Sequence, residues 1–231
     1  MNLKTELREN YIKILENVQK ACEKSGRKIE EIKILGASKK QSPEKIKIIF
    51  ELGVKMFGEN YVQEAEKKIL ELKNFPIEWH FIGRLQTNKV KKALGLFSMI
   101  QTLDRINLAQ EIQKQAEKRD LRIPVLIEIN IGKELTKGGV DPEKLEEFIE
   151  EIKKFDRIKI KGLMCLPPYE ENPEKTRPYF AKMREIFEKI KPYMDSEFRE
   201  LSMGTSNDYT IAIEEGATII RIGEALFGKR I

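Results

Sequence analysis

The sequence predicts an α/β fold in which eight parallel strands and their connecting helices close into a single (β/α)8 (TIM) barrel. Eight short apolar runs alternate with longer amphipathic stretches along the 231 residues, and a regular strand–helix alternation is typical of a parallel sheet. No linker or low-complexity segment interrupts the alternation. Eight strand–helix units in roughly 200–250 residues are typical of a barrel. One domain over residues 1–231 is therefore expected.

The strand predictions depend on apolar runs bounded by polar residues or glycine. The predicted strands are residues 32–38, 54–58, 77–83, 97–102, 123–130, 158–165, 198–203 and 217–222. A doubly wound open sheet is the alternative, but it usually has fewer strands. No G-x-G-x-x-G motif follows the first run, which argues against a dinucleotide-binding sheet.

Amphipathic stretches before and between the strands predict helices. They are residues 4–25, 43–52, 61–72, 87–94, 104–119, 142–154, 173–193 and 206–215. Ser42, Asp141 and Asn172 each stand directly before a proline. A capping side chain followed by proline at the first helical position marks the start of a helix. These three helix starts are therefore the most specific.

Composition excludes several classes of protein. The net charge is +5, and basic residues alternate with acidic ones, as on solvated helices and unlike a nucleic-acid-binding stripe. No apolar stretch approaches ~18–20 residues, and no signal peptide begins the chain, so a cytoplasmic protein with no membrane partner is expected. Cys22 and Cys165 lie far apart, and His80 is the one histidine, which argues against a metal site.

Lys39 ends the first predicted strand. In a barrel, the functional site lies at the carboxyl ends of the strands, and a lysine amine there can form a Schiff base. Lysine and arginine together number 43, so an ordinary surface role is the alternative. Polar residues and glycine also follow the other strands, for example Asn60 after the second. This asymmetry between the two ends of the strands favours a site beside Lys39.

Two segments near the carboxyl terminus predict a phosphate site. Residues 202–208 are small and rich in hydroxyl groups, and Ser206 is a candidate N-cap of the helix that follows. Gly223 follows the last strand and permits close approach of the backbone to a ligand. Barrels commonly bind phosphate after strands seven and eight, at free backbone N–H groups. An ordinary capped helix is the alternative.

Strand alternation puts Arg221 on the same face of the last predicted strand as Ile219. A buried guanidinium needs a partner, which is either a ligand atom or a carboxylate such as Glu128 or Glu224. The first and last strands of a barrel pair, so Lys39 lies next to this strand. An amine, an arginine and a phosphate site at one mouth indicate pyridoxal 5′-phosphate (PLP). A Schiff-base aldolase is the alternative, and it would usually need additional carboxylates or a tyrosine.

Six ordered segments carry a resemblance to a known family. They are residues 37–39 (ASK), 57–64 (FGENYVQE), 79–89 (WHFIGRLQTNK), 162–164 (GLM), 201–208 (LSMGTSND) and 221–228 (RIGEALFG). On these segments the chain resembles the pyridoxal phosphate homeostasis proteins (the YggS/PROSC-like family) from end to end. The resemblance implies a barrel like the N-terminal domain of alanine racemase, of PLP fold type III, without that enzyme's C-terminal β-domain.

The resemblance also implies a set of cofactor-binding residues, and PLP held as a Schiff base on Lys39. Arg221 would meet the pyridine nitrogen, and Asn60 and His80 would line the cofactor's edge. Phosphate would be held by Ser202, Ser206 and the backbone of Gly223 and Glu224. The family often has Ser or Thr where Glu224 stands, and a carboxylate repels phosphate, so only the Glu224 backbone is assigned to it.

The expected function is intracellular PLP homeostasis, by storage of the cofactor or its delivery to PLP-dependent apo-enzymes, with a monomer and no robust catalysis. Only a short tail follows the last predicted strand, so no second domain is expected to cover the mouth. A racemase needs a base on each face of its substrate, and Lys39 serves one face only. Tyr61, Tyr169 and Tyr209 are the candidates for the other. The alternatives are a racemase-like enzyme and a nucleic-acid-binding module. The latter is disfavoured because aromatic residues are not interleaved with the basic clusters of this sequence.

Overall fold

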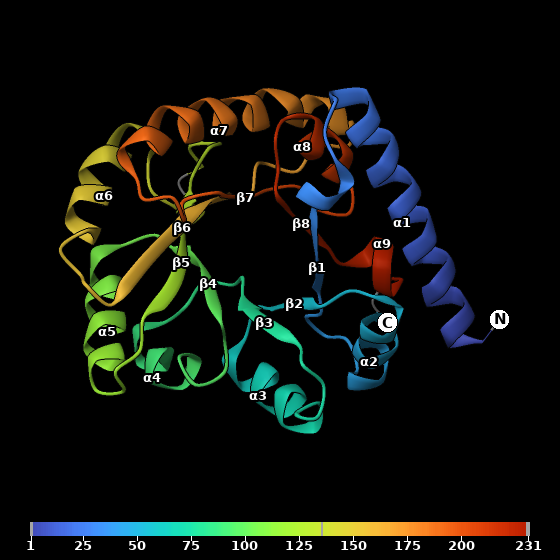
Figure 1. Ribbon diagram of the computed structural model, residues 1–231, viewed down its shortest axis with the longest axis horizontal. Helices are drawn as coiled ribbons and strands as arrows, with labels where there is room; N and C mark the ends of the chain where they lie inside the picture. Colours follow the sequence, from blue (N-terminus) through green and yellow to red (C-terminus); the bar gives the residue numbers. More distant parts are fainter. Residues whose placement is uncertain (1, 135, 230–231) are drawn as a thin grey trace.

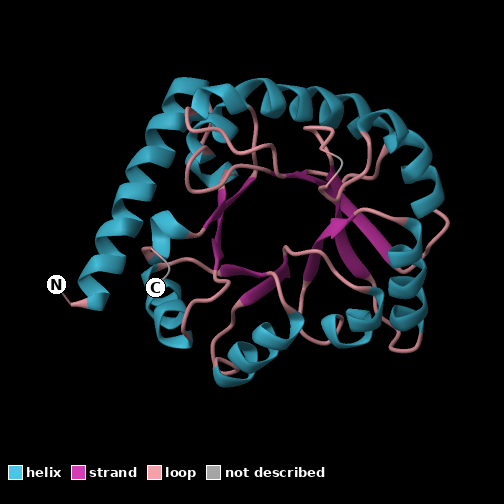
Figure 2. Ribbon diagram, turned by 180° about the vertical axis from the view of Figure 1, so that it is seen from behind, coloured by secondary structure: helices cyan, strands magenta, loops and turns pink. Residues whose placement is uncertain are grey.

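Eight parallel strands form a closed barrel in a computed structural model that describes residues 2–134 and 136–229. Figures 1 and 2 show the ring of strands with helices on its outside. The strands are β1 (Lys33–Ala37), β2 (Met56–Glu59), β3 (Glu78–Phe81), β4 (Met99–Leu103), β5 (Ile123–Ile129), β6 (Ile158–Cys165), β7 (Glu200–Ser202) and β8 (Ile219–Ile222). The predicted domain, residues 1–231, extends beyond the described residues at both ends.

The barrel closes through parallel pairing of β1 with β8, in which Leu35 lies opposite Arg221. This pairing confirms the (β/α)8 prediction, and the open-sheet alternative is wrong because no strand of the ring is left at an edge. Each observed strand overlaps its predicted range, and β6 matches its range at both ends. The strands run in sequence order around the ring, so that each strand pairs with the ones before and after it in the chain.

The outer layer consists mainly of α-helices. They are α1 (Leu3–Ser25), α2 (Pro43–Leu52), α3 (Val62–Glu71), α4 (Val90–Ala93), α5 (Ile106–Glu117), α6 (Leu145–Ile152), α7 (Arg177–Ile190), α8 (Tyr209–Glu214) and α9 (Glu224–Phe227). Single 3₁₀ turns lie at Ile29–Glu31, Thr87–Lys89, Pro142–Lys144, Pro173–Thr176 and Lys191–Tyr193.

The predicted helix starts are largely correct. The side chain of Ser42 accepts a hydrogen bond from the backbone of Lys45 and caps α2. Asp141 and Asn172 cap in the same way, although each begins a 3₁₀ turn that leads into the α-helix. The start predicted at Ser206 is too early, because α8 begins at Tyr209. Helix α9 was not predicted, since a helix of four residues is too short to show a helical period.

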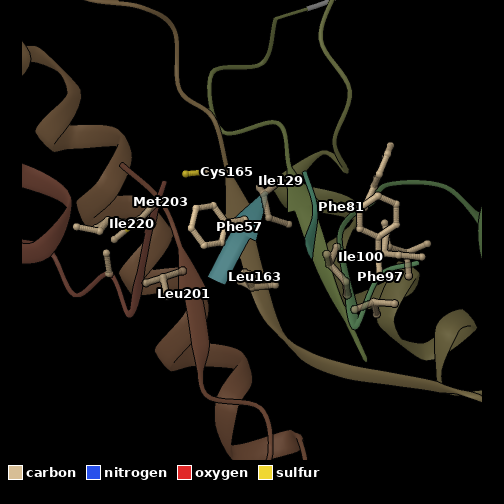
Figure 3. Packing of buried hydrophobic residues seen from close by; sticks show 14 of the residues in the cluster. Phe57, Phe81, Phe97, Ile100, Ile129, Leu163, Cys165, Leu201, Met203 and Ile220 are labelled. Atoms are coloured by element: carbon tan, nitrogen blue, oxygen red, sulfur yellow. The ribbon is translucent and has the colours of Figure 1, made fainter. Parts of the chain in front are cut away.

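Outward-facing strand residues pack against the helices. Phe57 of β2 contacts Trp79 of β3 and Phe227 of α9, with ring centroids 5.9 Å and 6.5 Å apart. Phe81 meets Phe97 edge to face at 5.2 Å, and Figure 3 shows Phe57, Phe81 and Phe97 among the buried apolar side chains. Helix α1 covers α8, α9 and α2 from outside, as Figure 1 shows.

The interior of the barrel, in contrast, carries polar side chains. His80, Gln101 and Ser202 are fully buried there, and Arg221 is 5% exposed. Buried polar groups are tolerated only when they are hydrogen-bonded. The interior therefore depends on specific polar contacts as well as on packing.

Among the described residues, no helix is both long and apolar enough to cross a membrane.

Candidate functional site

A cavity of about 490 Å³ opens at the carboxyl ends of the strands. It brings together six of the eight predicted site residues: Lys39, Asn60, Ser206, Arg221, Gly223 and Glu224. They come from the ends of β1, β2 and β8 and from the loop after β7. The structure therefore places the predicted amine, arginine and phosphate site around one cavity.

Lys39 follows β1 and is partly buried in the cavity wall. Its Nζ lies 5.1 Å from the centroid of the Tyr61 ring, a cation–π contact. The next residue, Lys40, has a φ of 61°, a left-handed conformation that is uncommon for a residue with a side chain. The backbone around Lys39 is thus a tight turn that other contacts must stabilise.

Those contacts come from a buried charge cluster behind the turn, made by Lys68, Glu59 and Glu64. The Lys68 ammonium, 5% exposed, donates to the carbonyl of Ser38 at 2.7 Å, to Glu59 Oε1 at 2.7 Å and to Glu64 Oε1 at 2.6 Å. All three of its N–H groups are therefore used. Glu64 Oε1 also accepts the backbone N–H of Lys40 at 2.6 Å. The cluster holds the backbone on both sides of Lys39.

Glu59 is the costly member of the cluster. It is fully buried, and its Oε2 has no hydrogen-bond partner among the described residues. Burial raises the pKa of the Glu59 carboxyl, and the charge of Lys68 offsets part of that effect. This cluster was not among the site residues predicted from the sequence. The feature of the sequence that could have predicted the cluster is the pair Glu64 and Lys68, which are four residues apart on a helix that starts beside the site.

Arg221 connects the ends of three strands. Its NH1 donates to Ser202 Oγ of β7 and its NH2 to the carbonyl of Cys165 of β6, each at 2.8 Å. Burial lowers the pKa of the guanidinium. Within the described part of the chain, Arg221 makes no ion pair, so neither Glu128 nor Glu224 is the partner considered from the sequence. A nearly buried cation thus faces a cavity without a bonded carboxylate.

The loops after β7 and β8 meet at Ser206. Its Oγ accepts the backbone N–H groups of Gly223 and Ala225, each at 3.1 Å. Ser206 is therefore not the N-cap of α8 as predicted; Asp208 occupies that position, in a turn where its Oδ1 accepts the N–H of Thr205 at 2.6 Å. Two backbone N–H groups that converge on one oxygen are suited to an oxyanion.

A glycine makes this turn possible. Gly204 has a φ of 89°, and a Cβ there would lie 2.5 Å from the Cβ of Ala212. Its carbonyl accepts the N–H of Arg221 at 3.0 Å. Any larger residue would push the loop after β7 away from β8 and from Arg221.

His80 and Ser202 are not among the residues that line the cavity, and their predicted contact with the cofactor stays a prediction. Both are fully buried in the interior beneath it. His80 lies level with Gly58, two residues before Asn60 on the neighbouring strand. Strand alternation correctly points both side chains inward, but the sequence does not say how deep each one lies.

Glu128 is the most informative residue of the cavity wall beyond the predicted set. Burial, together with the nearby charge of Asp104, raises the pKa of the Glu128 carboxyl to about 7, and the charge of Arg221 acts in the opposite direction. Met164, Lys137, Tyr169 and Asp208 also line the cavity. In the described part of the chain, no group of three or more His, Cys, Asp or Glu residues is arranged to hold a metal ion.

The closed (β/α)8 barrel carries a lysine, an arginine and two converging backbone N–H groups at its mouth. These features define the class of protein to which the chain belongs. Residues 12–230 match the family of the alanine racemase N-terminal domain. Within that class, the chain belongs to the pyridoxal phosphate homeostasis proteins. It is 52% identical to the pyridoxal phosphate homeostasis protein of Aquifex aeolicus over 96% of this chain and 97% of the relative. It is 33% identical to that of Escherichia coli, with 97% of each chain covered.

Solved structures show the same architecture. A protein of Bifidobacterium adolescentis, described as unknown, superposes with a TM-score of 0.91 at 30% identity, over 98% of this chain and 97% of that one. PipY of Synechococcus elongatus, solved with PLP bound, superposes with a TM-score of 0.79 at 32% identity, over 86% and 93%. Alanine racemase of Clostridium difficile, at 19% identity and a TM-score of 0.75, shares the fold over 97% of this chain and 60% of the racemase.

The Lys68 cluster yields the first prediction. Replacing Lys68 with Met leaves two carboxylates without their cation, one of them fully buried, and should lower the free energy of unfolding by about 3–5 kcal/mol. Urea denaturation measures the change. Lys67→Met, at an exposed neighbouring position, is the control and should change stability by less than about 0.5 kcal/mol. Equal effects of the two substitutions would contradict the role given to Lys68.

Glu128 yields a pH-dependent prediction. Its pKa is raised from 4.5 to about 7 in the folded chain, so ionisation opposes folding as pH rises through that range. Glu128→Gln should therefore match the parent near pH 4 and become more stable than it at pH 8, by up to about 3 kcal/mol. Urea denaturation across pH measures the difference. Glu147→Gln, at an exposed position, is the control. A stability difference between Glu128→Gln and the parent that stays constant with pH would show that the raised pKa of Glu128 is wrongly assigned.

Proposed function

We propose that this chain binds PLP in the cavity at the barrel mouth and serves PLP homeostasis, by storing the cofactor or delivering it to PLP-dependent apo-enzymes. The observation that carries the proposal is Arg221, a nearly buried cation to which no carboxylate of the described residues is bonded, in the same cavity as Lys39. The names of the relatives, and the PLP bound to PipY, support the same conclusion.

The donor set fits the chemical groups of this cofactor. When bound, PLP supplies an aldehyde that condenses with a primary amine with loss of water, a ring nitrogen that accepts a hydrogen bond, and a phosphate. Lys39 provides the amine. Arg221 provides a hydrogen-bond donor for the ring nitrogen, and the Gly223 and Ala225 N–H groups provide the phosphate site. The Ser206 hydroxyl, which occupies that site, rotates to donate to the phosphate as well.

Arg221 also determines what the site does poorly. A guanidinium keeps its proton, because its ordinary pKa exceeds ~12. It therefore hydrogen-bonds a ring nitrogen without protonating it, and an unprotonated pyridine is a weak electron sink. Stabilising a carbanion is the main catalytic use of PLP. The residues favour holding the cofactor over turning over a substrate, and we propose a carrier role without robust catalysis.

The compartment and assembly state belong to the same proposal. Cys22 and Cys165 are free and buried, as expected in a reducing compartment, so we place the protein in the cytoplasm. Burial raises the pKa of the Cys165 thiol to about 12, which leaves it unreactive. The carrier role needs no second copy of the chain, and we propose a monomer.

Glu128 favours a second candidate function, a racemase-like activity on amino acids. A carboxyl with a pKa of about 7 in the cavity that holds Lys39 is suited to accept and return a proton near neutral pH. Glu128 would provide the second acid–base group of a racemase, the role for which three tyrosines were considered from the sequence. Tyr209 is buried against Asn17 of α1, and Tyr61 and Tyr169 are largely exposed.

Absorption spectroscopy tests the cofactor proposal. Purified protein with added PLP should show a band near ~420 nm that borohydride abolishes, as a lysine adduct does. Lys39→Ala should lose the band, and Lys47→Ala, an exposed lysine outside the cavity, should keep it. A protein that takes up no PLP, or a band that survives in Lys39→Ala, would overturn the proposal.

Exchange of the α-hydrogen separates carrier from enzyme. PLP-loaded protein is incubated in D₂O with L-alanine and with D-alanine, and deuterium incorporation and chirality are followed by NMR and chiral chromatography. For a carrier we expect no turnover above that of free PLP. Turnover that Glu128→Gln removes would establish the racemase-like candidate in its place.

A further inference from the structure

A continuous hydrogen-bonded column crosses the barrel interior below the cavity. Arg221 NH1 contacts Ser202 Oγ at 2.8 Å, and Ser202 Oγ contacts Gln101 Oε1 at 2.7 Å. Gln101 Nε2 contacts His80 Nδ1 at 2.8 Å, and His80 Nε2 contacts Glu78 Oε1 at 2.8 Å. These five residues come from β8, β7, β4 and β3. We call them the interior column.

The column connects the two ends of the barrel. Arg221 lines the cavity at the carboxyl ends of the strands. Glu78 is the first residue of β3, and its side chain is 48% exposed. His80, Gln101 and Ser202, between them, are fully buried. The column therefore runs from the ligand cavity to solvent at the opposite face, through a region with no access to water of its own.

Arg221 sets the direction of every hydrogen bond in the column. A guanidinium only donates, so Ser202 Oγ accepts from it and gives its single O–H to Gln101 Oε1. The Gln101 amide then directs an N–H at His80 Nδ1, which must carry no proton. His80 Nε2 carries the proton and donates to Glu78. Turning the amide around would leave the buried Ser202 O–H without an acceptor in the column, which is costly.

The far end of the column is consistent with this direction. The hydrogen bond from His80 lowers the pKa of the Glu78 carboxyl, which keeps an acceptor at the point where the column needs one. Because each residue of the column is hydrogen-bonded to the next, the column is a rigid support. The second contact of Arg221, with the carbonyl of Cys165, is to backbone. Ser202 is thus the side chain that orients the guanidinium.

We propose that Ser202, Gln101 and His80 are positioning residues, which orient the Arg221 guanidinium toward the cavity and transmit its ligand contact to the His80 ring. The inference rests on the proposed function, in which Arg221 donates to the cofactor's ring nitrogen. An acceptor on Arg221 polarises the bonds behind it, since hydrogen bonds in a chain reinforce one another in a low-dielectric interior. His80 therefore senses the cofactor without touching it.

The single histidine of the chain makes the test specific. In ¹⁵N-labelled protein at neutral pH, the two ring nitrogens of His80 should show Nε2 protonated and Nδ1 unprotonated. Titration with PLP should shift both resonances and saturate at one equivalent. This measurement on the unaltered protein needs no variant. A ring protonated at Nδ1, or resonances that do not move while the band near ~420 nm forms, would overturn the proposal.

A set of serine variants tests the positioning role. Ser202→Ala removes the link between Arg221 and Gln101 and should weaken PLP binding about tenfold and abolish the His80 response. Ser202→Thr keeps the hydroxyl and should restore both. Ser98→Ala, which removes a serine hydroxyl bonded to the Trp79 carbonyl outside the column, is the control. Thermal denaturation shows whether each variant is folded.

The outcomes separate this proposal from the proposed function. Failure of the unaltered protein to form the band near ~420 nm would count against the function itself. If the band forms, and folded Ser202→Ala binds PLP as tightly as the parent or retains the His80 response, the column is merely structural and the inference is wrong.

Discussion

The site depends on the pairing of β1 with β8. That single ladder places Leu35 opposite Arg221, and Lys39 follows four residues later at the cavity wall. The pairing thus brings the strand that leads to Lys39 beside the strand that carries Arg221. Closure also supplies the walls of the cavity, because the loops after β7 and β8 meet only when the ring is complete. Lys39 is thereby placed for binding by the fold itself, even though its own loop is a strained turn.

Two buried polar assemblies support the two cations of the site in different ways. Lys39 is held through its backbone, since the Lys68 cluster bonds the peptide groups on either side and leaves the amine free. Arg221 is held through its side chain, by Ser202 and the Cys165 carbonyl. A ligand-binding amine must be free to react, whereas a hydrogen-bond donor must be fixed in direction. The barrel meets both needs with groups that never enter the cavity, at the cost of burying Glu59 and Arg221.

The balance of charge in the cavity is consistent with reversible binding of an anionic, aldehyde-bearing ligand. Lys39, Arg221 and the backbone N–H groups near Ser206 attract it, while Glu128, Asp208 and Glu224 lie in the same wall. Like charges near a phosphate limit affinity. A carrier must release its cargo, so moderate affinity is part of such a role. In the chains of known structure that share the fold at low identity, such as alanine racemase, this barrel makes up only part of the length.

The sequence by itself determined the alternation of strands and helices and the barrel class, and six of the eight site residues expected from it line the cavity, because strand period and position at a carboxyl end follow from local pattern. It also determined that Arg221 needs a partner. Only the tertiary structure decided what that partner is, since Arg221 bonds Ser202 of β7 and the carbonyl of Cys165, 56 residues away in β6. It placed His80, expected at the cofactor's edge, and Ser202, expected at its phosphate, in the buried interior. It showed that Ser206 is an acceptor for the loop after β8 and not a helix cap, and it revealed the contacts of Lys68. Local pattern states which face a side chain takes, whereas its depth and its partners depend on the register of strands that meet only in the closed barrel.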